Sequence, residues 1–182
     1  METRKSILPN SNLNMIETER LILHPLTHNQ LLKYIANDNS LEQELQLLPS
    51  EKKISNELKE ALEQTILPNV HNKDKNYLYN TLWALISKAD RKLIGDLCFV
   101  GEPDANGEIE IGYGTYEAFR GKGFMTEAVA RIIEWAKQQE GVKIITASTA
   151  VDNVASYAIL EKNNFVKIAE GEGMFTWKLD LQ

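Results

Sequence analysis

The first regular pattern in the chain has a period of two residues. Within residues 16–26 (IETERLILHPL), Leu21 and Leu23 share one face of this pattern, which predicts a strand that Pro25 closes. Thr27 follows at a position where its side chain can cap a helix. We therefore expect a strand and then a helix at the start of the folded region.

A second period, of three to four residues, runs through residues 51–66. Its stripe consists of Ile54, Leu58, Ala61, Leu62, Thr65 and Ile66, with Thr65 as the position that is not apolar. Lysine and glutamate residues face elsewhere, so the segment is predicted to be an amphipathic helix. Pro68 is expected to end this helix, and residues 70–76 (VHNKDKN) read as a polar loop.

The pattern then changes to short β-rich runs. These are residues 82–87 (LWALIS), 93–100 (LIGDLCFV) and 108–116 (EIEIGYGTY). Two turn-like segments separate them, residues 88–92 (KADRK) and 102–107 (EPDANG). Short strands joined by tight turns predict an antiparallel meander.

The last third of the chain mixes helical and strand patterns. An apolar stripe over residues 125–136 predicts a long helix that stops at Gly141. A strand over 143–151, a short helix over 152–163 and strands over 165–170 and 174–181 are expected to follow. The order of elements indicates an α/β or α+β protein, in which helices cover a sheet.

Length and composition support one ordinary globular domain. The chain has 182 residues, of which 43% are hydrophobic and 25% charged. It has no apolar run of about 20 residues and no secretory signal, so we expect a cytoplasmic protein without a membrane partner. We expect residues 16–182 to form the domain and residues 1–15 a mobile arm, with Met15 left open as an alternative start.

Charge and cysteine content exclude several functions. The formal net charge of −6 argues against a nucleic-acid binder and suits amine-bearing partners slightly better. No His/Cys cluster has the spacing of metal ligands, so we expect no metal. Cys98 is the single cysteine. We favour a buried, small apolar role for Cys98 over a nucleophilic one.

A glycine-rich stretch precedes the long predicted helix. A Walker A loop is excluded, because Gly123 stands where Ser or Thr should follow Lys122. A dinucleotide fingerprint fails because Glu117 replaces its third glycine. What remains is a strand, the run Arg-Gly-Lys-Gly over residues 120–123, and a helix. This order favours a phosphate site, and a solvated turn with two surface cations is the alternative.

Four segments together resemble a known family. They are ETERLILHPL, EIEIGYGTYEA, FRGKGFMTEA and DNVASYAILEKNNF, which occur in this order within residues 16–181. The chain is similar to the GNAT acetyltransferases, and most of all to the branch that acetylates the N-termini of ribosomal proteins. This resemblance implies a mixed, mostly antiparallel sheet of about seven strands, flanked by about four helices, whose central strands splay apart.

The resemblance also implies where acetyl-CoA binds. The loop before the long helix would hold the pyrophosphate through Arg120, Gly121, Lys122, Gly123, Phe124 and Met125. The end of the preceding strand, Tyr113, Gly114 and Thr115, would offer backbone groups to the pantetheine and a donor to the thioester carbonyl. Asn153 is implied as a further CoA contact.

Direct transfer of an acetyl group to an amine requires a general base and a general acid. Glu108 and Glu110 lie two residues apart on a predicted strand, and the resemblance favours Glu110 as the base. The alternative for Glu110 is an exposed carboxylate on a strand face. Ser156 is implied as the acid, with Tyr157 as its rival, whereas the local pattern alone places Asn153 at a helix cap.

The sequence therefore predicts an N-acetyltransferase that passes the acetyl group of acetyl-CoA directly to a primary amine, either a protein N-terminus or a small molecule. A covalent route through Cys98 is the mechanistic alternative. A non-catalytic GNAT-like module that binds CoA or a partner is the functional alternative. The identity of the amine is not readable from the sequence, and a homodimer is left open.

Overall fold

The computed structural model of the protein describes residues 14–181, so most of the expected mobile arm over residues 1–15 lies outside the described residues. Two residues of that segment are described. Asn14 donates a hydrogen bond to the Tyr77 hydroxyl at 2.9 Å, and Met15 packs against a core cluster. These two residues therefore contact the folded domain.

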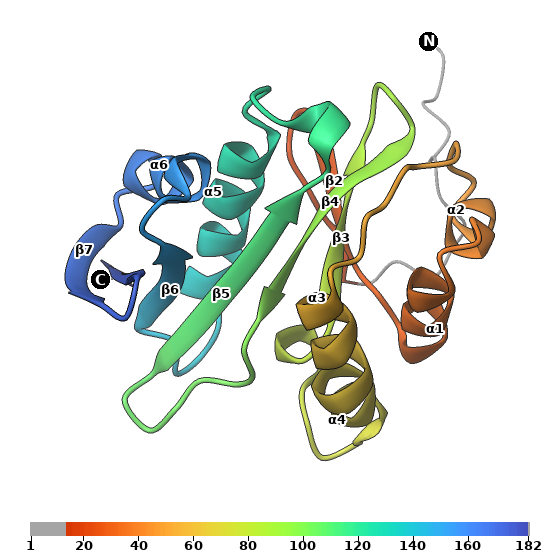
Figure 1. Cartoon of the computed structure of the whole chain (residues 1–182). Coiled ribbons are helices and arrows are strands. Elements are labelled where there is room, and N and C mark those ends of the chain that lie inside the picture. Colours follow the sequence, from red (N-terminus) through yellow and green to blue (C-terminus); the bar gives the residue numbers. More distant parts are fainter. Residues whose placement is uncertain (1–13, 182) are drawn as a thin grey trace, which may run out of the picture.

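One mixed sheet forms the centre of the molecule (Figure 1). Its strands are β1 (Ile16–Glu17), β2 (Leu21–Pro25), β3 (Leu82–Ser87), β4 (Lys92–Phe99), β5 (Glu108–Thr115), β6 (Ile144–Ala150), β7 (Val166–Gly171) and β8 (Met174–Asp180). They lie in the order β1-β2-β3-β4-β5-β6-β8-β7. Among the described strands the β5–β6 pair is parallel and the other pairs are antiparallel.

The predicted mixed, mostly antiparallel sheet is confirmed, but it has eight strands, where the sequence predicted about seven. The additional strand is β1, which pairs Ile16 with Leu23. β1 contains only two residues, too few to display a period of two along the sequence.

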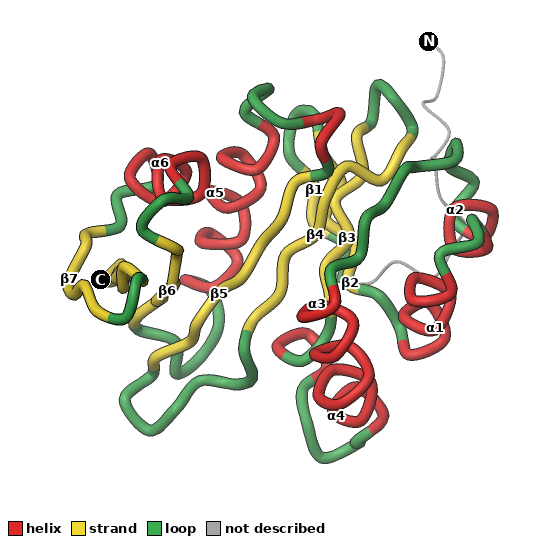
Figure 2. The backbone as a smooth tube through the Cα atoms, in the orientation of Figure 1, coloured by secondary structure: helices red, strands yellow, loops and turns green. Residues whose placement is uncertain are grey.

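Helices cover both faces of the sheet (Figure 2). The helical elements are α1 (His28–Ala36), α2 (Ser40–Glu44), α3 (Asn56–Ala61), the π-helical segment η1 (Leu62–Ile66), α4 (Leu67–His71), the short 3₁₀ turns η2 (Tyr77–Tyr79) and η3 (Glu117–Phe119), α5 (Phe124–Lys137) and α6 (Val154–Lys162). Apolar residues of α1, α2 and η1 pack on one face, and those of α5 and α6 pack on the other. The described part of the chain thus has more helical elements than the four or so that were predicted. No helix within residues 14–181 has the length and apolar character needed to cross a membrane.

Strand β2 illustrates how the sheet separates two cores. Leu21 and Leu23 are fully buried on the side of α5, whereas Ile22 is buried on the side of α1. The predicted strand and its end at Pro25 are therefore confirmed. Thr27 caps α1 by accepting a hydrogen bond from the Gln30 backbone, as its position in the sequence predicted.

The expected end of the second helix at Pro68 is wrong. Helical structure continues from α3 through η1 into α4 and ends at His71. Pro68 lies in the first turn of α4, which follows η1 directly. At the end of η1 the Leu67 N–H donates to the Leu62 carbonyl, which lies five residues earlier in the sequence. Proline lacks an N–H group, so a place where the regular four-residue spacing is already interrupted accommodates it.

The register of the central strands opens the sheet next to β5. On the β4 side, β5 is paired from Ile111 to Thr115. On the β6 side, the pairing ends at Ile111, which lies opposite Ala147. Strands β5 and β6 then diverge (Figure 1), so the last four residues of β5 present one free backbone edge. This confirms the predicted splay of the central strands.

Candidate active site

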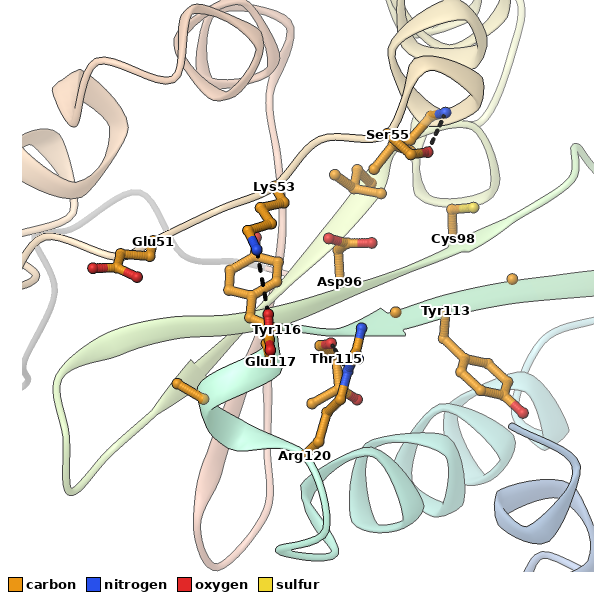
Figure 3. Close-up of a pocket in the computed structure, with 15 residues that line it drawn as sticks. Glu51, Lys53, Ser55, Asp96, Cys98, Tyr113, Thr115, Tyr116, Glu117 and Arg120 are labelled. Atoms are coloured by element: carbon orange, nitrogen blue, oxygen red, sulfur yellow. Dashed lines mark hydrogen bonds and ion pairs between the residues drawn. The ribbon is translucent and has the colours of Figure 1, made fainter. Parts of the chain in front are cut away.

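Two cavities lie on either side of the last residues of β5. The first, of about 550 Å³, lies between β5, the N-terminal end of α5 and one side of α6, and we call it the α5–α6 cavity. The second, of about 440 Å³, lies between β4, β5 and the segment before α3, and we call it the β4–β5 cavity (Figure 3). Tyr113, Gly114, Thr115 and Arg120 line both cavities. The cavities therefore adjoin at the end of β5.

The N-terminus of α5 opens into the α5–α6 cavity. Gly123 is its cap residue, with φ of 77°, and Gly121 has φ of 72°. Both values lie in the left-handed region that glycine adopts without strain. Gly123 offers no side chain to the first N–H groups of this 14-residue helix. Free N–H groups and the positive end of the helix dipole make this place suitable for an anion.

Arg20 anchors the loop that leads into α5. Its Nε lies 2.6 Å from Glu127 Oε2 in an ion pair, and its Nη1 donates to the Lys122 carbonyl at 3.0 Å. The guanidinium also lies 4.5 Å from the centre of the Phe124 ring. Burial opposes ionisation of Glu127, but hydrogen bonds from Thr18 and Arg20 hold its pKa below the ordinary value. The carboxylate therefore stays charged, and β2 is tied to the loop.

The predicted site residues other than Glu110 and Lys122 line the α5–α6 cavity. The Lys122 ammonium lies over the Phe119 ring, 5.0 Å from its centre. Glu110 is partly exposed on β5, opposite Thr146 of β6, and is not among the residues that line the two cavities. The structure thus gathers the predicted CoA-binding segments and leaves the predicted base outside their cavity.

Helix α6 presents Ser156 to the α5–α6 cavity. The Asn153 side chain caps α6 by accepting from the Ser156 N–H at 3.1 Å, so the local prediction of a cap is confirmed. The Tyr113 hydroxyl donates to the Ser156 carbonyl at 2.8 Å and ties β5 to α6. Burial raises the pKa of Tyr113 to about 12. Tyr157 instead stacks on Trp177, with ring centres 6.0 Å apart.

The β4–β5 cavity contains two ionisable side chains of β4, Asp96 and Cys98. They lie opposite Gly114 and Gly112 of β5, respectively. Burial, and then the charge of Asp96, raise the pKa of the Cys98 thiol to about 12. Cys98 is therefore protonated at neutral pH, which makes it a poor nucleophile.

Asp96 and Arg20 are site residues that sequence reasoning missed. A signal for Asp96 exists in the run LIGDLCFV, where an acidic residue interrupts a strand that otherwise reads as buried. Burying a carboxylate costs free energy, so such an interruption often marks a functional group. No comparable local signal identifies Arg20, whose partners lie more than 100 positions away in the sequence.

Comparison with known proteins places this site in a family. The acetyltransferase (GNAT) domain family matches residues 20–166, which is most of the chain. The chain belongs to the GNAT acetyltransferase family. The predicted membership of the GNAT family is thereby confirmed.

Individual GNAT relatives agree with this assignment. An uncharacterized N-acetyltransferase, YjdG, of Bacillus subtilis (strain 168) is 40% identical over 84 residues, which are 46% of this chain and 50% of the relative. The match thus spans about half the length of this curated relative. A ribosomal-protein-S5-alanine acetyltransferase from Vibrio fischeri has a TM-score of 0.66 at 21% identity, covering 92% of this chain and 96% of that one.

A second solved structure, a ribosomal L7/L12 alpha-N-protein acetyltransferase in complex with coenzyme A, has a TM-score of 0.64 at 18% identity, covering 92% of this chain and 98% of that one. At these identities the two solved structures show a shared GNAT fold.

Within residues 14–181 of this GNAT protein, no group of three or more His, Cys, Asp or Glu residues is arranged to hold a metal ion.

Replacing Arg20 by Gln is expected to weaken acetyl-CoA binding about tenfold, which corresponds to about 1.4 kcal/mol. The loop loses its ion pair to Glu127 and its hydrogen bond to the Lys122 carbonyl. Calorimetric titration with acetyl-CoA measures the effect. Arg131→Gln is a matched control, because Arg131 also donates to a backbone carbonyl, that of Glu17. Equal affinity in the parent and the Arg20 variant would contradict the anchoring role.

Proposed function

We propose that this protein is an N-acetyltransferase that transfers the acetyl group of acetyl-CoA directly to a primary amine. The observation that carries the proposal is the pair of cavities that adjoin at Gly114. One cavity contains a helix N-terminus suited to a diphosphate, and the other has a buried carboxylate suited to an amine. Two such sites on either side of one free strand edge suit a transfer between two substrates.

The proposed CoA site uses the residues predicted from the sequence. The pyrophosphate would lie at the N-terminus of α5, against the residues Arg120, Gly121, Lys122, Gly123, Phe124 and Met125. The free edge of β5 at Tyr113, Gly114 and Thr115 would bind the pantetheine, and Asn153 would add a contact from α6. All of these residues except Lys122 line the α5–α6 cavity, and Lys122 lies in the same loop, next to Gly121 and Gly123. This placement supports the assignment.

The chemistry proposed for the site is a single displacement. The reaction forms a C–N bond between the amine and the thioester carbonyl carbon and breaks the C–S bond. A backbone N–H at the free edge of β5 would stabilise the charge that develops on the carbonyl oxygen. The proton that the sulfur gains would come from the Ser156 hydroxyl, a role that its place in the α5–α6 cavity supports.

Glu110 is the base that the family resemblance suggests. Because Glu110 lies outside the lining of both cavities, it would have to act through intervening water. Tyr157 is less suited than Ser156 to the role of acid, since its ring is stacked on Trp177.

The proposed acceptor is a protein N-terminus or a small primary amine. The ribosomal-protein acetyltransferases among the structural relatives favour the former modestly, because a shared fold does not determine the substrate. An assay of CoA thiol release across a panel of peptide and small-molecule amines tests the function. Tight binding of acetyl-CoA without thiol release from any amine would favour the non-catalytic CoA-binding module instead.

Substituting Cys98 by Ala is expected to leave turnover within about twofold of the parent value, because a thiol with so high a pKa does not supply a thiolate near neutral pH. The thiol-release assay measures the rate, and mass spectrometry of the parent incubated with acetyl-CoA should detect no acetylated protein. A collapse of turnover in the variant, together with an acetyl adduct on the parent, would support the covalent route.

A further inference from the structure

Asp96 is the buried carboxylate of the β4–β5 cavity, and the single-displacement mechanism above assigns no proton transfer to it. The residue is 7% exposed, and its side chain lines the β4–β5 cavity, where it points away from β4 toward the segment that holds Ser55 (Figure 3). A Cβ atom added at Gly114 would lie 3.9 Å from Asp96 Oδ1. The carboxylate therefore stands beside the residue at which the two cavities adjoin.

Asp96 lacks the cation that a buried carboxylate normally requires. In the cavity, Lys53 is paired with Glu117 at 3.3 Å, and Arg120 Nε donates to the Thr115 carbonyl at 3.2 Å. Across residues 14–181, no ion pair within 4.0 Å includes Asp96. A buried charge without a partner costs free energy, so a cationic ligand would relieve this cost.

Two tyrosines tune the carboxylate. The Tyr34 hydroxyl, on α1, donates to Asp96 Oδ2 at 2.9 Å and lies 3.3 Å from the Tyr116 hydroxyl. Burial raises the pKa of Asp96 to about 6, although hydrogen bonding to Tyr34 and Tyr116 opposes the rise. At about pH 7 and above the carboxylate is therefore mostly ionised and also basic enough to accept a proton. The other titratable or charged groups that face it or line its cavity are Cys98, Glu51, Lys53, Tyr113, Glu117 and Arg120.

We propose that Asp96 binds the acceptor amine as an ammonium ion in the β4–β5 cavity and removes its proton. An N–H bond of the ammonium breaks, its electron pair stays on nitrogen, and the proton passes to the Asp96 carboxylate. The neutral amine then attacks the thioester across Gly114. As the C–N bond forms, the nitrogen loses a second proton, which replaces the proton that the Ser156 hydroxyl gives to the departing sulfur. This inference rests on the proposed function and assigns to Asp96 the contact with the amine that Glu110, outside both cavities, does not make.

Asp96→Asn is expected to lower kcat at about pH 7 by at least a hundredfold, the usual scale for loss of a general base. The loss should shrink at higher pH, where free amine is abundant. An alanine-initiated tetrapeptide serves as the acceptor. The affinity for acetyl-CoA should stay within about twofold, because Asp96 is outside the α5–α6 cavity. If kcat of Asp96→Asn is unchanged and Glu110→Gln shows the pH-dependent loss of kcat, the base is Glu110 and the proposal is overturned.

Thermal unfolding separates this role from a structural one. The pKa of Asp96 is raised in the folded protein, so the neutral form is the one that stabilises the fold, and this contribution is lost as the pH rises through about 6. Asparagine is neutral and can still accept from Tyr34. The Tm of Asp96→Asn should therefore equal or exceed that of the parent above about pH 7. A lower Tm, with equal activity loss at every pH, would indicate a structural role.

Tyr34→Phe tests the same role without removing the carboxylate. The variant loses the hydrogen bond that lowers the pKa of Asp96, so this pKa should rise further. In a plot of kcat against pH, the rise on the acidic side should then move to higher pH, and the affinity for acetyl-CoA should not change. An unmoved rise would contradict a base role for Asp96.

A binding measurement keeps this inference separable from the proposed function. The CoA-saturated parent and Asp96→Asn are titrated with the same tetrapeptide, and the variant is expected to bind about tenfold more weakly because the charge pair is lost. If no amine is acetylated, the proposed function fails. Equal peptide affinity in the two proteins, or no binding to the parent, would overturn the role of Asp96.

Discussion

Gly123→Asp is expected to abolish acetyl-CoA binding, with a loss of at least about a hundredfold in affinity. Gly123 caps α5 at the place proposed for the pyrophosphate. A carboxylate there would occupy the anion site itself, compete for the free N–H groups and repel a diphosphate. A side chain at this position would also begin 3.5 Å from Arg20 Nη2, which could pair with the new carboxylate and release the loop.

Calorimetric titration with acetyl-CoA measures this effect. Gly101→Asp is the matched control, because Gly101 has a similar φ of 85°, an added Cβ would meet no atom within 4 Å, and the added charge is the same. Gly101 lies in the turn between β4 and β5, outside the lining of both cavities. Undiminished binding by the Gly123 variant, or an equal loss in the Gly101 control, would show that this loop does not hold the pyrophosphate.

Gly95→Ala is expected to destabilise the fold by about 3 kcal/mol, which is the upper part of the usual range for overpacking. A Cβ atom at Gly95 would lie 2.4 Å from the Gly114 carbonyl oxygen. That atom belongs to the backbone of β5, which is paired with β4 at this point, so relief requires the two strands to shift. The same shift would displace Gly114, which lines both cavities.

Urea unfolding, followed by tryptophan fluorescence, measures this loss of stability. For a chain of this size a loss of about 3 kcal/mol corresponds to a fall in Tm of about 10 °C. Gly112→Ala is the control on the same pair of strands, since an added Cβ would meet Cys98 Sγ at an ordinary 3.7 Å. The control should change stability by less than about 1 kcal/mol. A Gly95 variant as stable as the control would show that β4 and β5 can separate without cost.

Short-range patterns in the sequence predicted much of the fold and the glycine-rich loop that begins α5. The strand ending at Pro25, the Thr27 cap and the Asn153 cap depend on residues no more than a few positions apart. The loop with Gly121 and Gly123 could likewise be recognised, because the backbone conformation and the helix that it begins are local properties. The placement of the predicted CoA-binding residues around one cavity agrees with that reading.

Local patterns failed where long-range packing decides the structure. β1 forms because β2 offers it an edge, and helical structure runs past Pro68 because a π-helical segment precedes that residue. The role of Glu110 as the base stays a prediction. Strand pairing determines which part of β5 has a free edge, and it leaves Glu110 outside the lining of the two cavities.

The sequence by itself determined most of the strands and helices, the glycine-rich loop before α5 and the capped start of α6, because each depends on the backbone preferences of neighbouring residues. Only the tertiary structure decided which side chains meet. Tyr34 and Asp96 are 62 positions apart, and Arg20 and Lys122 are 102 apart. Such contacts follow from the register of the sheet and from the burial of charge, neither of which a short stretch of sequence specifies.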